Sequence, residues 1–128
     1  DCVSAFDGFG REVCRINAKK ATDPVKAESL SFQNLEGAKQ NVSELFQLDL
    51  AAGLADSEWK AAVRGFQKRH LLSHKMGVVD SEYIRKSGDT HGVVGHKIHI
   101  EIGEVRVFSQ IIGKLARYLS ERMNRVGS

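Results

Sequence analysis

The stretch that decides the fold runs from Asp56 to Met76 and reads DSEWKAAVRGFQKRHLLSHKM. Asp56-Ser57-Glu58 predicts an N-terminal cap with acids in the first turn, which suit the positive end of a helix dipole. Gly77 follows the stretch as a stop signal. Between these ends, Trp59, Val63 and Phe66 recur at helical spacing and form one apolar stripe. The stretch therefore predicts an amphipathic helix whose stripe faces a core.

The last turns of this predicted helix carry ionisable side chains. At about 100° per residue, His70 falls about 20° from Trp59, while His74 and Arg69 lie at about 60° and about −80°. The periodicity thus predicts that His70 shares the buried face. A histidine on an apolar stripe is more often a structural residue than a catalyst, so both interpretations stay open at this point.

Apolar periodicity predicts two helices before this stretch. The first covers residues 1–20, where Gly8 and Gly10 lower the helix propensity, and close packing against a neighbour is the expected reason for their presence. The second begins at Ser31 or Asn34, both of which are good N-terminal caps.

The rest of the chain adds two helices and one extended piece. Residues 79–86 predict a short capped helix that Ser87-Gly88 ends, and the stretch from about Glu104 to Met123 predicts a long final one. Residues 93–102 alternate between apolar and polar side chains, which favours a short extended or hairpin segment. The predicted fold class is all-α, an up-down bundle of four to five helices in one domain spanning residues 1–128.

Size and composition fit one globular domain, with 128 residues and 41% hydrophobic content. No apolar run approaches the ~18 residues that a membrane span needs, and no signal peptide opens the chain. Because the chain begins at Asp1, we expect it to be an excerpt of a longer protein. Cys2 and Cys14 would lie about 18 Å apart on one helix, so we expect reduced thiols and a cytoplasmic location.

Positive charge is concentrated in the second half of the chain. Residues 1–64 carry 8 Lys/Arg and 10 Asp/Glu, whereas residues 65–128 carry 11 and 6, together with all five histidines. Such a half favours an anionic partner such as nucleic acid, although a solvated helix face explains the charge equally well.

Arginine beside histidine suits phosphate chemistry. The guanidinium of Arg69 offers a planar fork of donors to phosphate oxygens, and imidazoles such as His70 and His74 transfer protons near neutral pH. RNA supplies its own nucleophile, the 2′-hydroxyl, so cleavage needs only a proton acceptor, a proton donor and a cation. No metal or other cofactor is expected. One helix supplies few such groups, so two copies across a two-fold axis would complete the set.

The string Arg69-His70-Leu71-Leu72-Ser73-His74 resembles the R-x4-H form of the R-x4–6-H signature of HEPN domains (higher eukaryotes and prokaryotes nucleotide-binding). The polar residue that often follows the arginine in this family is matched by His70. The flanking sequences resemble the family too: Phe66-Gln67-Lys68 before the string, Gly77-Val78-Val79-Asp80 and Tyr83-Ile84 after it, and Ser4-Ala5-Phe6-Asp7-Gly8-Phe9 near the start.

The resemblance implies a helical bundle that dimerises through the motif-bearing helices and acts as a metal-independent endoribonuclease. It implies that Arg69 stabilises phosphate charge, that His74 is a general acid/base, and that His70 orients the phosphate or the other two side chains. Asp7 would position Arg69 or His74, with Glu12 as a competing candidate. Family members occur in toxin–antitoxin systems and phage defence, which implies RNA as a partner and leaves room for an antitoxin or additional domain.

A second hypothesis is a non-catalytic interaction or sensor domain that binds RNA, a nucleotide or a partner protein. Some HEPN-like proteins keep the bundle and cleave nothing, so intact Arg69 and His74 do not prove activity. A DNA-binding domain ranks below both, because no helix shows exposed Arg, Asn or Gln at groove spacing.

Overall fold

A computed structural model describes residues 1–127, and this part of the chain is all-α, as predicted. Its six α-helices include five of seven residues or more, and α2 adds one short turn to the four to five helices expected. The helices are α1 (Cys2–Ile16), α2 (Pro24–Ala27), α3 (Leu35–Phe46), α4 (Asp56–His74), α5 (Ser81–Ser87) and α6 (Ile102–Arg125), with 3-10 turns η1 (Ala18–Lys20) and η2 (Leu50–Gly53).

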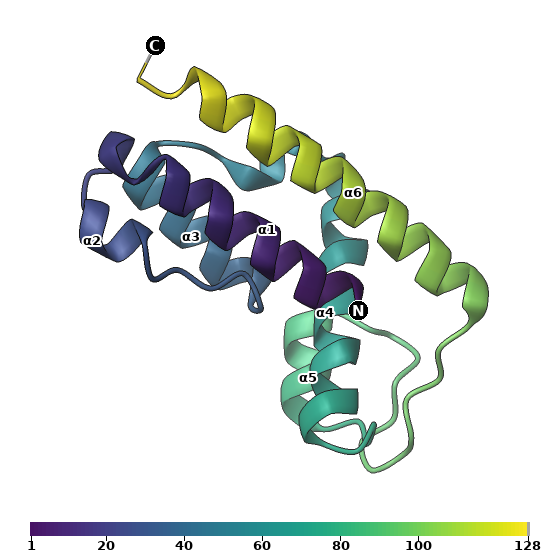
Figure 1. The fold of residues 1–128 in the computed structure, drawn as a ribbon. Helices are drawn as coiled ribbons and strands as arrows, with labels where there is room; N and C mark the ends of the chain where they lie inside the picture. The colour runs from purple at the N-terminus through teal and green to yellow at the C-terminus, as the bar shows by residue number, and fades with distance from the viewer. Residues whose placement is uncertain (128) are drawn as a thin grey trace.

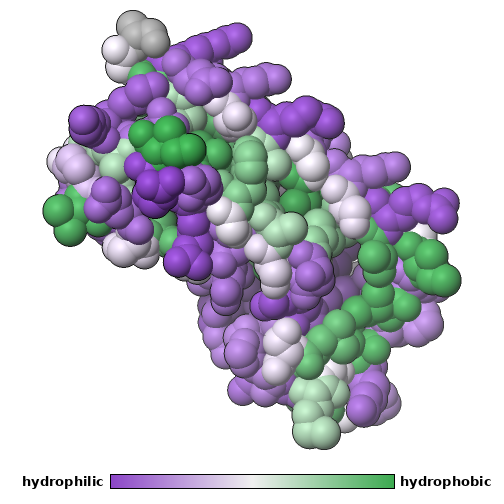
Figure 2. All heavy atoms as spheres, viewed as in Figure 1, coloured by the Kyte–Doolittle hydropathy of each residue, from purple (hydrophilic) through white to green (hydrophobic). Residues whose placement is uncertain are grey.

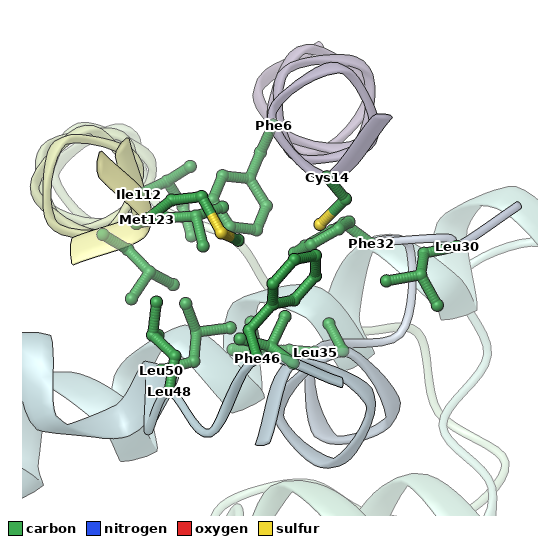
Figure 3. Packing of buried hydrophobic residues seen from close by; sticks show 14 of the residues in the cluster. Phe6, Cys14, Leu30, Phe32, Leu35, Phe46, Leu48, Leu50, Ile112 and Met123 are labelled. Atoms are coloured by element: carbon green, nitrogen blue, oxygen red, sulfur yellow. The ribbon is translucent and has the colours of Figure 1, made fainter. Parts of the chain in front are cut away.

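Helices α1 and α6 pack side by side and run in the same direction (Figure 1). α3, which carries Leu35 and Phe46, lies across the core from α1 (Figure 3). α4 packs against both α3 and α6. The last turns of α4 project beyond this body and pack against α5, and residues 88–101 loop around them toward α6 (Figure 1). We call α5, residues 88–101 and the last two turns of α4 the distal lobe.

The main core lies between α1, α3, α4 and α6. Figure 3 shows Phe6 and Cys14 of α1 pointing toward Phe32, with Ile112 of α6 entering from the side. The ring of Phe6 packs edge-to-face on Phe32 at 5.7 Å and on Phe66 at 6.2 Å between centroids. Edge-to-face pairs add to the stabilisation from burial, and this cluster fixes α4 against α1.

Side-chain caps set most helix starts. Asn34 accepts a hydrogen bond from Gly37 at the start of α3, and Asp80 accepts one from Tyr83 at the start of α5. At α4, Asp56 is the first helical residue and not the predicted cap. The cap position belongs to Ala55, whose N–H donates to Glu58; this bond, followed by the hydrogen bond from Lys114, lowers the pKa of Glu58.

The two glycines of α1 differ in their surroundings. A Cβ atom on Gly10 would lie 2.7 Å from the ring of Phe32, so the prediction of close packing is confirmed there. A Cβ atom on Gly8 would meet nothing within 4 Å, so the same prediction is wrong for Gly8. Gly10 is therefore required by the core, whereas Gly8 faces solvent.

The extended or hairpin segment predicted at residues 93–102 does not form a strand in the described part of the chain. Lys97 makes an isolated antiparallel bridge with Val78, and the N–H of Ile98 donates to Gly77 O at 2.7 Å. The segment pairs with residues 77–79 along a few positions only, and Ile102 already begins α6. The alternation reflects Ile98 packing on the small core of the distal lobe, not a sheet.

Cys2 and Cys14 are free thiols, as expected from their separation. Burial raises the pKa of the Cys14 thiol to about 12, which keeps this thiol protonated at neutral pH. Within residues 1–127, no helix combines the length and the apolar character that crossing a bilayer requires.

Candidate functional site

The candidate site forms where α4 ends. The N–H groups of Lys75 and Gly77 both donate to Leu71 O, at 2.8 and 2.9 Å, and a positive φ at Met76 and Gly77 turns the chain away after His74. His74 therefore occupies the last helical position. Its imidazole lies one turn from that of His70, with 4.8 Å between ring centroids and an interplanar angle of 43°.

His70 does not share the buried face that the periodicity predicts. Its side chain is exposed, whereas Lys68 and Leu71 are buried. The buried face of α4 changes direction here because Leu71 packs with Val79 and Tyr83 in the distal lobe. The angular positions of residues relative to Trp59 on one helix do not predict this contact. Two imidazoles are thereby presented to solvent.

A groove of about 270 Å³ holds Arg69, His70 and His74 together, and we call it the histidine groove. One wall comes from the loop before α3, with Ser31, Gln33 and Asn34, and the other from the start of α5. The remaining lining residues are Phe66, Gln67, Leu71, Asp80, Glu82, Tyr83 and Lys86. The three motif side chains are thus brought to one concave site with amide groups beside them.

Arg69 is anchored by the first turn of α1. Its Nη2 donates to Ser4 Oγ at 3.2 Å, and its Nε lies 3.4 Å from Asp1 Oδ2. The Arg69 side chain is 27% exposed, so the guanidinium is partly desolvated and keeps free donors for an anion. Ser4 lies in the N-terminal stretch that the resemblance covers, but the contact itself was not predicted.

The structure places Asp7 away from the three motif side chains. Its buried carboxylate accepts a hydrogen bond from the N–H of Phe32 at 2.6 Å and from Gln33 Nε2 at 3.3 Å. Asp7 therefore fixes the loop whose Gln33 lines the histidine groove. Glu12, the competing candidate, is exposed and pairs with Arg15, which lowers the pKa of Glu12.

The α5 wall of the groove carries both signs of charge. Lys86 Nζ lies 2.7 Å from a carboxylate oxygen of Glu82, and this hydrogen bond lowers the pKa of Glu82. Tyr83 donates its hydroxyl to Asp89 at 2.7 Å; burial first, and then this bond, raises the pKa of Tyr83. Lys86 is a second cation facing the motif, one that sequence reasoning missed because α5 is separate from the R-x4-H string.

A larger groove lies on the other side of Arg69. It has a volume of about 610 Å³ and runs between the first turn of α1, α4 and the first half of α6. Its lining is mostly apolar, with Leu72, Val105, Val107 and Phe108 among its residues, and we call it the apolar groove. Arg69 lines both grooves.

Lys68 links α4 to α6. It is 8% exposed, and its ammonium pairs with the carboxylate of Glu104 in the first turn of α6. A buried ammonium without a partner would be costly, so this pair fixes how α6 meets α4.

No group of three or more His, Cys, Asp or Glu side chains in the described residues is arranged to hold a metal ion. The chain is thus a small all-α domain in which an arginine and two histidines share a groove. Compared with protein families, curated proteins and solved structures, it matches none.

Proposed function

We propose that this chain is a HEPN-type domain that cleaves RNA by a metal-independent attack of the 2′-hydroxyl on the adjacent phosphate. The proposal includes homodimerisation through the motif-bearing helices. The observation that carries it is the gathering of Arg69, His70 and His74 in one groove of about 270 Å³. The reaction needs a cation and proton-transfer groups, and these three side chains supply them without a cofactor.

Each motif residue has a separate role in this proposal. Arg69 neutralises the charge that develops on the phosphate, and Ser4 orients its guanidinium. His74 transfers a proton, and His70 contacts the phosphate beside it. Asp7 acts indirectly, because it holds the loop that presents Gln33 to the groove.

The distribution of exposed apolar side chains supports a second copy as the partner at the motif-bearing end. Among residues 1–127, seven of the ten exposed large hydrophobic residues fall between positions 72 and 107: Leu72, Met76, Val93, Val94, Ile102, Val105 and Val107. Figure 2 shows hydrophobic side chains gathered at the start of α6 and along the segment before it. A monomer seldom exposes such a concentration, which favours an interface.

The apolar groove fits the symmetry of a homodimer. A two-fold interface uses one patch twice, so opposite charges within the patch can pair across the axis, and Arg64 and Glu104 both line this groove. Because Arg69 borders both grooves, a partner seated on the apolar groove would lie next to the histidine groove and exclude water from it. A cytoplasmic role in defence or in a toxin–antitoxin system follows as part of the proposal, with an antitoxin or further domain restraining the site.

The test is incubation of the purified chain with a mixed RNA pool, with and without EDTA. We expect cleavage in both, with products that end in a 2′,3′-cyclic phosphate and a 5′-hydroxyl. His74→Ala should abolish cleavage and leave the dimer mass unchanged, while His96→Ala, which alters an exposed histidine outside the groove, should cleave like the wild type. Loss of activity in EDTA, or full activity in His74→Ala, would reject this mechanism.

A second candidate function is a non-catalytic domain that binds RNA, a nucleotide or a partner protein. The contacts of Arg69 with Ser4 and Asp1 favour it, because a guanidinium already bonded within the protein is partly occupied. Retention of labelled RNA without cleavage, weakened by Arg69→Ala, is the result that distinguishes this function from the nuclease.

A further inference from the structure

His70 and His74 form a pair whose geometry is set by one helix turn. They are four residues apart on α4, with 4.8 Å between ring centroids and 43° between ring planes. Both side chains are exposed and line the histidine groove, so both have access to one bound phosphate. The separation is on the scale of a single phosphate group, whose different oxygens two adjacent rings can contact.

Two neighbouring imidazoles are suited to hold one proton between them. Charging both would place two like charges side by side, and interacting groups therefore take up protons in two steps that belong to the pair. Histidine changes charge between about pH 5 and 8, so near neutral pH one ring of such a pair can be neutral while the other is charged. That combination is one general base and one general acid.

We propose that His70 and His74 of the same protomer form the complete acid–base pair of the site, with His70 as the base and His74 as the acid. This inference rests on the proposed function and deepens it, because it assigns proton transfer to His70 as well. The partner copy is then needed to cover the groove and not to supply a histidine.

The surroundings distinguish the two rings. His74 is the last residue of α4. His70 directly follows Arg69, the side chain that neutralises the phosphate in the proposed function. The charged or titratable groups that face the pair are Arg69 on α4, Asp80 at the cap of α5, and Glu82, Tyr83 and Lys86 on α5, with Lys75 next to His74 in the chain.

The facing groups of α5 and its cap are engaged within the protein. Glu82 and Lys86 form an ion pair, and Asp80 is engaged as the cap of α5 through the N–H of Tyr83. Tyr83 donates its hydroxyl to Asp89 and therefore turns its proton away from the pair.

The step balances with these two side chains alone. His70 accepts the proton of the 2′-hydroxyl while the 2′-oxygen forms a bond to phosphorus. The bond from phosphorus to the 5′-oxygen breaks, and His74 donates its proton to that oxygen. The products are a 2′,3′-cyclic phosphate and a 5′-hydroxyl, and the two histidines have exchanged protonation states, which solvent reverses.

The first test is the pH dependence of single-turnover cleavage by wild type, His70→Asn and His74→Asn. Wild type should give a bell-shaped profile, and each variant should lose about 10²–10⁴-fold in rate. The rate falls at low pH because the base becomes protonated, so His70→Asn should lose the acidic limb of the profile. The rate falls at high pH because the acid loses its proton, so His74→Asn should lose the alkaline limb. A bell that persists in His70→Asn would overturn the assignment.

A substrate with an activated leaving group tests the roles separately. A ribonucleoside 3′-(4-nitrophenyl phosphate) releases nitrophenolate without needing a proton, so it should restore much of the rate of His74→Asn and little of that of His70→Asn. The reverse pattern would exchange the two roles and refute the proposal. Both rings are exposed, so neither substitution should alter the circular dichroism spectrum or the dimer mass.

Mixing the variants tests whether the pair acts within one chain. If both histidines of a site come from the same protomer, every site in a mixed dimer of His70→Asn and His74→Asn lacks one of them, and activity should not return. Recovered activity would show a site shared between protomers. Absence of cleavage by the wild type would instead overturn the proposed function itself, which separates the two failures.

Discussion

Asp7 accepts a hydrogen bond from the backbone N–H of Phe32, with 2.6 Å between Oδ1 and N. Both residues are buried, and they are 25 positions apart in the sequence. A buried N–H without an acceptor destabilises a fold, so Asp7 is a structural requirement of the loop before α3. Through Gln33, that loop also forms one wall of the histidine groove.

Replacing Asp7 should therefore lower stability before it alters chemistry. Asp7→Ala leaves the N–H of Phe32 buried and unpaired, and we expect a loss of about 1–3 kcal/mol in the free energy of unfolding. Asp7→Asn keeps an oxygen acceptor and should lose less while retaining cleavage. Urea denaturation and the RNA assay measure the two effects, and an inactive but fully stable Asp7→Asn would restore a catalytic role for this carboxylate.

Ser4→Ala should weaken cleavage without affecting stability. The hydroxyl of Ser4 holds the guanidinium of Arg69 at 3.2 Å, and removing one such hydrogen bond costs about 1 kcal/mol, or about fivefold in kcat/KM. Ser43→Ala, on the exposed face of α3, is the matched control. A rise in kcat/KM would show instead that Ser4 restrains Arg69 from its substrate.

Gly10→Ala and Gly8→Ala should have opposite effects on stability. A methyl group at Gly10 would press on the buried ring of Phe32, and overpacking of this kind costs about 1–3 kcal/mol. A methyl group at Gly8 meets open space, and alanine is favoured over glycine within a helix by about 0.5–1 kcal/mol. Thermal unfolding of the two variants tests this, and equal shifts would contradict the packing seen in the core.

Glu104→Ala should destabilise the junction of α4 and α6. It leaves the ammonium of Lys68 buried without its partner, and because the Glu104 side chain is 44% exposed we expect a loss of about 1–2 kcal/mol, below that of a fully buried pair. Lys68→Met combined with Glu104→Ala should recover the loss. Lys60→Ala removes an exposed pair with Asp56 and should change stability little.

Cys14 should make the fold sensitive to alkaline pH. The pKa of its thiol rises from 9.0 to about 12 on folding because burial disfavours the thiolate. The folded chain thus keeps a proton that the unfolded chain loses, so this contribution is complete below pH 9.0 and disappears as pH rises toward about 12. Urea midpoints should fall more steeply over this range in wild type than in Cys14→Ser. Cys2→Ser, at a half-buried thiol, should behave like the wild type.

Local patterns predicted the helices well. Asn34, Asp80 and Gly88 mark helix ends in the sequence and cap helices in the structure, because a cap depends on neighbours within a few residues. For residues 93–102, alternation suggested an extended or hairpin piece; the segment forms no strand in the described part of the chain and makes one isolated bridge, between Lys97 and Val78. An alternating pattern indicates only which side chains are buried. Here Ile98 packs on the small core of the distal lobe, and no sheet is needed to bury it.

The sequence predicted Arg69, His70 and His74 as one motif, but it did not predict which side chains surround them. Periodicity placed His70 on the buried stripe of Trp59, whereas the helix changes its buried face where it leaves the main core for the distal lobe. The spacing of residues along one helix cannot report which neighbour packs on each turn.

The amino-acid sequence alone determined that this protein is helical, where its main helices lie, and that an arginine and two histidines follow one another within two turns. Those properties depend on apolar periodicity and caps, which act over a few residues. Only the tertiary structure decided that Arg69 reaches Ser4, that Asp7 holds Phe32, and that both histidines face solvent. Arg69 and Ser4 are 65 residues apart, and a contact across that separation exists only once the helices have packed.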